Sequence, residues 1–262
     1  MKKYQIYRNA TLILSFVVII ETMILIQVWF TRPRKRLAPV PPVVKGKIAI
    51  VIDDWGYNLN HFRMLEEIGY PLTISVLPNL SCSSWIAQQA NRMGLEVILH
   101  LPLEPYERYN LESDTITTSM DEVTIKGIIE KALADIPTAK GVSNHMGSKA
   151  TADFRVMEIV FRELKRRNLY FLDSLVSPKS ICFDVARKVR LNFAQRDVFL
   201  DNQEDTDYIK GQIDKLKTIA KVHGQVIGIG HVRKNTLDVL KEMMPLLAKQ
   251  GYKFVFVSEL AR

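Results

Sequence analysis

Two aspartates and three histidines share one property: each stands where a strand-like run of the sequence ends. These residues are Asp53, Asp54, His100, His145 and His231. Carboxylates and imidazoles can accept or donate protons in a reaction near neutral pH. Such groups are costly to remove from water unless they bind something. We therefore expect the five to form a ligand-binding site if the fold brings them together.

The elements that must position these residues follow from the pattern after Lys47. Short β-branched runs alternate there with segments of helical period, which predicts parallel strands joined by crossover helices. The predicted strands are 47–53, 72–77, 96–101, 141–144, 169–173, 192–200, 225–231 and 253–258. A capping-box pattern at 119–122 predicts the start of the helix before the fourth strand.

Seven or eight such units in residues 47–262 favour an α/β fold of the (β/α)7-8 barrel type. An open doubly wound sheet is the alternative, but no glycine-rich phosphate loop or P-loop lysine follows the first strand. In a barrel the carboxyl ends of the strands converge on one face. The same argument brings Asn144, Asp173 and Ser174 to that face, where we expect them to contact substrate or orient an imidazole.

The amino-terminal part of the chain has a different character. Residues 1–9 are short and basic, and residues 10–30 form an apolar run interrupted only by Glu21. That run is long enough to cross a bilayer as one helix, so a transmembrane anchor or uncleaved signal is predicted. Residues 31–46 are basic and proline-rich and predict an extended tether. Basic residues flank the span on both sides, so its orientation is open.

Charge and cysteine content narrow the partners. Residues 1–46 hold eight Lys or Arg against one acid, whereas residues 47–262 hold 28 basic and 27 acidic side chains. The folded part therefore has no basic excess that would indicate a nucleic-acid partner. The two cysteines, Cys82 and Cys182, do not define a disulfide framework, and whether they pair is open. The oligomeric state is equally unspecified.

Six motifs over residues 47–262 resemble one family. They are IAIVIDDWG at 48–56, PLTISVLPN at 71–79, EVILHLPLEP at 96–105, GVSNHMGSKAT at 141–151, FLDS at 171–174 and GIGH at 228–231. The set resembles the divergent polysaccharide deacetylases, which are related to the NodB-type carbohydrate esterases. The resemblance implies a NodB-like distorted barrel and a divalent metal, usually zinc, held by one aspartate and two histidines.

The resemblance also implies roles for individual residues. Asp54, His100 and His145 would be the metal ligands, Asp53 the general base, and His231 the general acid that protonates the leaving amine. The implied activity is metal-dependent deacetylation of an N-acetylated envelope polysaccharide, with water at the metal as the nucleophile. With the predicted anchor, it further implies a bacterial cytoplasmic membrane protein whose barrel lies on the periplasmic or extracellular side.

The sequence departs from the standard family pattern at two points. The residue four after His100 is Glu104, so the second histidine comes from the next strand, and no arginine motif follows that strand. A catalytically impaired carbohydrate-binding module on the same barrel is therefore the alternative function.

Two other hydrolase classes are less well supported. An amidohydrolase or phosphodiesterase would lack its His-x-His or H-E-x-x-H pattern. A glycosidase needs two opposed carboxylates, for which Glu104 and Glu259 are the available glutamates.

Overall fold

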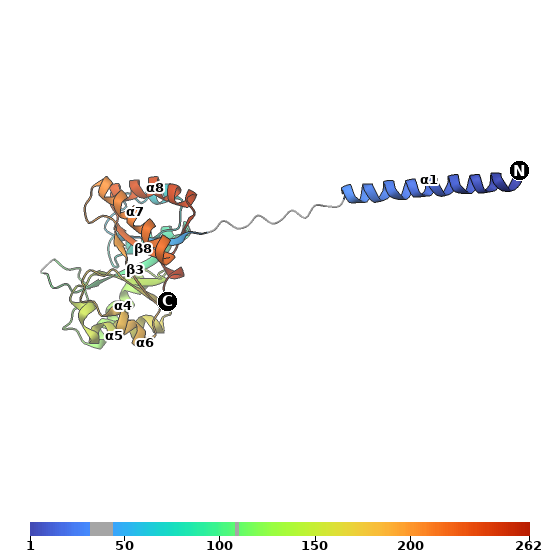
Figure 1. Cartoon of the computed structure of the whole chain (residues 1–262). Coiled ribbons are helices and arrows are strands. Elements are labelled where there is room, and N and C mark those ends of the chain that lie inside the picture. The colour runs from blue at the N-terminus through green and yellow to red at the C-terminus, as the bar shows by residue number, and fades with distance from the viewer. Residues whose placement is uncertain (32–43, 108–109) are drawn as a thin grey trace. The chain divides into compact units, whose positions relative to one another are not determined.

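The computed structural model describes residues 1–31, 44–107 and 110–262 (Figure 1). The chain divides into two compact units, residues 1–42 and 43–262. The predicted tether falls largely on residues 32–43, which lie outside the described residues.

The first unit contains one long helix, α1 (Lys2–Thr31). Its most apolar window has a mean hydropathy of 2.3, and none of its residues is buried against protein. The predicted span at 10–30 lies inside this helix. By length and composition α1 is a candidate membrane span, although a signal sequence would have the same properties.

The second unit is a parallel α/β fold. Its strands are β1 (Gly46–Trp55), β2 (Thr73–Val76), β3 (Glu96–Leu103), β4 (Gly141–Met146), β5 (Tyr170–Asp173), β6 (Phe193–Gln195), β7 (Val198–Phe199), β8 (Gln225–His231) and β9 (Tyr252–Val255). Its helices are α2 (Met64–Ile68), α3 (Ser83–Arg92), α4 (Glu122–Asp135), α5 (Phe154–Arg166), α6 (Cys182–Val189), α7 (Thr206–His223) and α8 (Lys234–Lys249), with short 3-10 turns η1 (Ala150–Ala152) and η2 (Val257–Glu259). The βα alternation predicted from the sequence is confirmed.

The described strands form one sheet in the order β6-β5-β4-β3-β2-β1-β8-β7, and β9 also pairs with β1. The predicted strand at 192–200 is in fact two short strands, because the chain changes partner there: β6 pairs with β5, and β7 pairs with β8. One continuous segment thus connects the two ends of the strand order. The fold is a curled parallel half-barrel, as expected for a distorted barrel.

The core has two parts because side chains alternate along each strand. Ile48, Ile50 and Ile52 of β1 belong to the cluster that also contains the buried helix residues. Ala49 and Val51 belong to a second cluster with Val257 and Leu260 from the carboxyl-terminal segment. Val257 and Leu260 therefore pack against the inner face of the curled sheet. Figure 1 shows α7 and α8 on one side of the sheet and α4, α5 and α6 on the other.

The helix before β4 starts differently from the prediction. The capping-box pattern placed the N-cap at Ser119, but α4 begins at Glu122 and its N-cap is Asp121. The Asp121 carboxylate accepts a hydrogen bond from the Thr124 N–H at 2.8 Å. An aspartate directly before the helix satisfies an unpaired N–H and carries the charge that a helix amino terminus favours, so it replaces the serine two residues earlier.

Candidate metal centre

The end of β1 departs from a regular strand, and this departure positions both aspartates. Adjacent side chains of a strand normally point to opposite faces. Here the pairing of β1 with β2 shifts register between Ile52 and Trp55, and Asp54 adopts a left-handed φ of 67°. Aspartate tolerates this conformation better than most residues. The irregularity turns Asp54 toward the same group of histidines that Asp53 approaches.

Three of the predicted residues meet at one point. Asp54 Oδ1 lies 3.2 Å from His100 Nε2 and 3.1 Å from His145 Nδ1, and the two imidazole nitrogens lie 3.2 Å apart. They come from β1, β3 and β4, which lie close together in the strand order. In the described part of the chain this is the group of acidic, His and Cys side chains whose spacing suits a metal ion.

The spacing of the three atoms fits a divalent cation. Zinc binds imidazole nitrogen and carboxylate oxygen at about 2.0–2.1 Å in tetrahedral geometry, which places two ligand atoms about 3.3 Å from each other. The three distances of 3.1–3.2 Å are close to that value. A set of two imidazoles and one carboxylate also leaves a fourth coordination position for water or substrate. The residues present therefore fit the metal that the fold family implies.

A second layer of hydrogen bonds orients His100. Its Nδ1 lies 2.8 Å from Ser143 Oγ, and Ser143 Oγ lies 2.6 Å from Ser75 Oγ. All three side chains are buried. When Nδ1 carries the only ring proton and donates to Ser143 Oγ, the lone pair of Nε2 is free to bind a metal; without a metal, Nε2 can carry a proton and donate to Asp54. Such partners commonly fix the tautomer of a ligating histidine.

The electrostatics of the cluster favour a charged Asp54. Burial opposes the charged form, but hydrogen bonds from His100 and His145 hold the pKa of Asp54 far below 3.8. Burial likewise opposes protonation of His100, yet the nearby Asp53 and Asp54 charges raise its pKa above 6.5. The carboxylate is thus ionised and ready to bind a cation over the physiological pH range.

Asp53 lies deeper than Asp54. Only about 4% of its side chain is exposed, against 30% for Asp54, and its Oδ2 is 3.8 Å from His100 Nε2. Burial raises the pKa of Asp53 above 3.8. Its Oδ1 is a buried atom with no hydrogen-bond partner in the described protein. A buried carboxylate oxygen without a partner is unusual and indicates a group that completes its interactions from outside the chain.

His231 stands beside Asp53 because β8 pairs with β1 and the two residues are directly opposite. Its Nδ1 is 2.8 Å from Asp201 Oδ1, and its backbone N–H donates to Asp201 Oδ2 at 2.7 Å. Burial opposes protonation, but the Asp201 hydrogen bond and charge raise the pKa of His231 above 6.5. Its ring stacks on Phe199, with centroids 6.0 Å apart.

Asp201 is a site residue that the sequence argument missed. It is fully buried and comes directly after the predicted strand at 192–200. That placement is the same signal that identified Asp53 and Asp173, so the residue could have been found. The Asp173 carboxylate accepts hydrogen bonds from the Leu175 N–H and the Ser180 hydroxyl and not from an imidazole of the described residues, so a contact of Asp173 with substrate stays a prediction.

Asn144 and Ser174 hold two loops together. The Asn144 side chain donates to the Met146 carbonyl and accepts from the Ser174 N–H, and the Ser174 hydroxyl donates to the Asn144 carbonyl. These bonds fix the ends of β4 and β5 next to the candidate metal centre. A direct contact of either residue with substrate stays a prediction.

The paired carboxylates that a glycosidase needs are not formed by Glu104 and Glu259. Glu104 accepts hydrogen bonds from Thr118 and Lys149. Glu259 lies on η2, and its neighbour Ser258 bonds to Glu96 at the start of β3. Glu104 follows the other end of β3, so the two glutamates lie near opposite ends of that strand.

The two cysteines are free, so no disulfide joins Cys82 and Cys182. The disulfide that the sequence left open does not form in this structure.

The protein is a curled parallel α/β half-barrel with an Asp-His-His cluster at the carboxyl ends of its strands. The sequence model of the family described as divergent polysaccharide deacetylase matches residues 50–261. The chain belongs to this family.

The chain is also similar to individual proteins. The chain is 35% identical to the Escherichia coli (strain K12) protein YibQ over 208 residues, which are 79% of this chain and 65% of YibQ. It therefore spans just under two thirds of that relative's length.

Among solved structures, protein ATU2773 from Agrobacterium tumefaciens C58 has a TM-score of 0.78 at 24% identity, covering 88% of this chain and 92% of that one. The Bacillus anthracis protein BA3943, described as a CE4 family pseudoenzyme, has a TM-score of 0.51 at 14% identity, covering 86% and 69%. At these identities the two structures support the fold.

Proposed function

We propose that the protein is a metal-dependent deacetylase that hydrolyses N-acetyl groups of an envelope polysaccharide. The observation that carries the proposal is the convergence of Asp54, His100 and His145 on one point with the spacing of metal ligands. Membership of the divergent polysaccharide deacetylase family supports the substrate class. Zinc is the proposed metal, since it favours two imidazoles and a carboxylate with one open position.

Four polar residues of the site, Asp53, Asp54, Asp201 and His231, have parts in this reaction. A bound divalent ion would supply a Lewis acid that polarises the amide carbonyl and makes water a better nucleophile. Asp53, next to the ligand Asp54, accepts the proton of the attacking water. His231 donates a proton to the amine nitrogen as it leaves, and Asp201 holds the His231 ring in the orientation that this transfer needs.

The exposure of the side chains agrees with these roles. His231 is 26% exposed and His145 16%, whereas His100 and Asp53 are nearly covered. A glycan can therefore approach the exposed side of the cluster, and the buried side holds the geometry fixed.

Acetate release tests the proposal. The purified full chain, loaded with zinc, is incubated with N-acetylglucosamine oligomers and with peptidoglycan fragments, and free acetate is measured. Acetate is expected from at least one substrate, and none is expected after chelation of the metal. Sugar release without acetate, or acetate release that survives chelation, contradicts it.

The non-catalytic alternative also has an observation in its favour. Among the described residues the buried Asp53 Oδ1 has no hydrogen-bond partner, and Arg196 donates to the Ser174 and Leu175 carbonyls and lies over the Phe199 ring instead of orienting Asp53. A general base without an orienting group would be weak. Glycan binding with no acetate release from any substrate in the panel would favour this second function.

We further propose that α1 anchors the chain in the bacterial cytoplasmic membrane, with residues 43–262 on the periplasmic or extracellular side. The uniformly exposed apolar surface of α1 and the polysaccharide-acting family support this location. Fusing a reporter that is active only outside the cytoplasm to Arg262 tests it. An inactive reporter on an expressed fusion contradicts the proposed side.

A further inference from the structure

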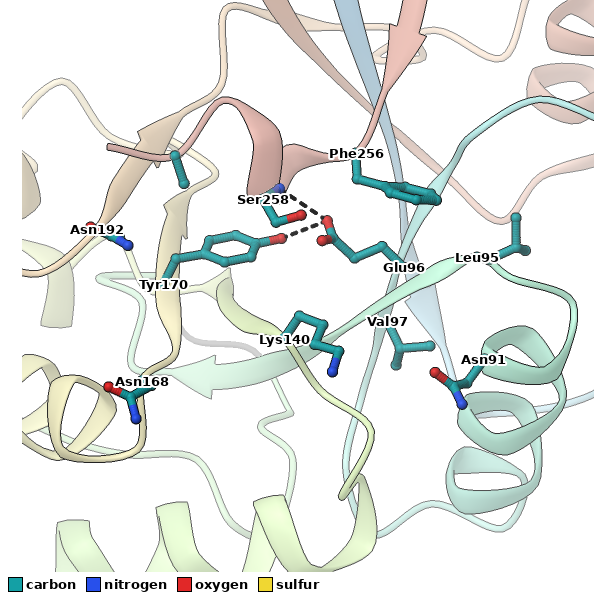
Figure 2. A pocket seen from close by; sticks show the side chains of 11 residues that line it. Asn91, Leu95, Glu96, Val97, Lys140, Asn168, Tyr170, Asn192, Phe256 and Ser258 are labelled. Carbon is teal, nitrogen blue, oxygen red and sulfur yellow. Dashed lines mark hydrogen bonds between the residues drawn. The ribbon is translucent and has the colours of Figure 1, made fainter.

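A cavity of about 440 Å³ lies around the amino ends of β3 and β5, whereas the metal-ligand candidates lie toward the carboxyl ends of their strands (Figure 2). Glu96 and Val97 begin β3, and Tyr170 begins β5. Glu96 precedes the metal ligand His100 by four residues in a strand that rises about 3.3 Å per residue, so the two are about 13 Å apart. The cavity is thus separate from the metal centre.

The central residue of the cavity is a buried carboxylate whose two oxygens differ. Glu96 is 6% exposed. Its Oε1 accepts from the hydroxyls of Thr73 and Tyr170, each at 2.9 Å, and from the Ser258 N–H at 3.2 Å. Glu96 lines the cavity, and its Oε2 accepts no hydrogen bond from the described residues. One oxygen therefore holds the fold together and the other is available to a ligand.

The rim of the cavity supplies groups that recognise hydroxyls. Three exposed amides, from Asn91, Asn168 and Asn192, can both donate and accept hydrogen bonds. The ring of Phe256 forms part of the wall and is only half-buried, and Lys140 adds a cationic donor. Figure 2 shows the Glu96 carboxylate between Tyr170 and Phe256, with the amides around it.

We propose that this cavity is a second saccharide-binding site, which takes a sugar unit that presents a hydroxyl or ammonium donor to Glu96 Oε2. A carboxylate oxygen that has no donor among the described residues can accept a hydrogen bond from a ligand, and a sugar ring supplies donors together with an apolar face for Phe256. The amides then bind the remaining hydroxyls. The choice of a saccharide over another donor-rich ligand rests on the proposed function.

Such a site would hold a second segment of the polysaccharide away from the metal centre. Burial and the nearby Glu96 charge raise the pKa of Tyr170 well above 10. The Tyr170 hydroxyl therefore keeps its proton and donates to Oε1 over the whole working range of pH. This leaves Oε2 as the acceptor that faces a ligand.

Glu96→Gln separates the structural role of this residue from the binding role. The glutamine oxygen can still accept the bonds from Thr73, Tyr170 and Ser258, while its NH₂ replaces the acceptor that faces the cavity. The test is calorimetric titration of the full chain, metal-free, in a detergent without a sugar headgroup. The two probes are glucosamine tetramer and N-acetylglucosamine tetramer.

The wild-type chain is expected to bind at least one probe, and Glu96→Gln to weaken that binding by about 10-fold or more, as for loss of a hydrogen bond to a charged acceptor. Stronger binding of the glucosamine tetramer identifies the donor as an ammonium; equal binding identifies a hydroxyl. The matched control Glu130→Gln changes the same charge at an exposed position of α4 and is expected to bind as the wild type.

His145→Ala makes the failure of this proposal distinguishable from failure of the metal site, because it removes a proposed metal ligand and leaves the cavity intact. Binding that survives His145→Ala but is lost in Glu96→Gln supports the site. Should Glu96→Gln unfold, Asn192→Ala tests the exposed rim and is expected to weaken binding. No binding of either probe to the wild type, unchanged binding in the folded rim or Glu96 variants, or loss of all binding in His145→Ala overturns the proposal.

Discussion

Asp201 holds His231 at two points: its Oδ1 lies 2.8 Å from the imidazole Nδ1, and its Oδ2 accepts the backbone N–H of the same histidine at 2.7 Å. The Thr236 hydroxyl donates to Oδ2 as well. One buried carboxylate therefore fixes both the backbone and the ring of the proposed general acid.

Asp201→Asn should lower the pKa of His231. The asparagine oxygen can replace Oδ2, so its NH₂ faces Nδ1, which must then accept a hydrogen bond and carry no proton. The imidazolium is disfavoured, and nuclear magnetic resonance titration of the ring protons should show the midpoint move downward. A midpoint equal to the wild type would mean that Asp201 does not set the charge of His231.

The same pair predicts a pH dependence of stability. The folded pKa of His231 is raised above 6.5, so its contribution is complete below about pH 6.5 and is lost as the pH rises through the folded value. The folded pKa of Asp201 is lowered, so its contribution is present above about pH 3.8 and is lost as the pH falls below that.

Urea unfolding measures this dependence. The loss of unfolding free energy in Asp201→Asn should be larger at pH 6 than at pH 9. An equal loss at both values would contradict the linkage.

Ser143→Ala should weaken metal binding by about 10- to 100-fold, the usual effect of removing a partner of a ligating histidine. The substitution leaves His100 Nδ1 without its acceptor, so the ring can turn and its tautomer is no longer fixed. Competition with a zinc-sensitive chelator measures the affinity. Ser119→Ala, at an exposed serine outside the site, serves as the control and should match the wild type.

Asp53→Asn should reduce acetate release by about 10²- to 10⁴-fold, the range of a general base, while metal content stays at the wild-type level. The amide cannot take a proton from water but has nearly the same shape. A variant that loses its metal together with its activity would show that Asp53 is a ligand. Unchanged turnover would remove it from the reaction.

Gly147→Ala tests the turn that follows β4, the strand of the proposed ligand His145. Gly147 has a φ of +94°, and an added Cβ would lie 2.8 Å from Leu103 Cβ. Strain of this kind costs about 1–3 kcal/mol, and each kcal/mol lowers Tm by about 2–4 °C in a domain of this size. Gly127→Ala, in α4 with open space around it, is the matched control and should leave Tm unchanged or slightly higher. Equal Tm values for the two variants would contradict the account.

Much of the site could be predicted because its residues share one local signal. A polar residue at the carboxyl end of a buried strand identified Asp54, His100 and His145 without any knowledge of distances, since the carboxyl ends of parallel strands must converge. Their meeting point depends on features that periodicity does not contain. The left-handed conformation of Asp54 and the register shift of β1 are set by tertiary packing.

The features that the sequence did not predict have physical causes of the same kind. The segment 192–200 is predicted as one strand, but its two ends pair with different strands, β6 with β5 and β7 with β8. Asp173 carries the same signal as Asp53, yet its carboxylate turns to Leu175 and Ser180 within its own loop. Spacing alone did not distinguish an aspartate that bonds its own loop from one that bonds a histidine of another strand, as Asp201 does.

Metal content of the purified chain tests the central claim most directly. After dialysis against trace zinc, elemental analysis should find about one ion per chain in the wild type and in His223→Ala, a variant at the end of α7, and almost none in His100→Ala or His145→Ala. A full equivalent in both of the latter variants, or none in the wild type, would contradict the assignment of Asp54, His100 and His145 as one metal centre.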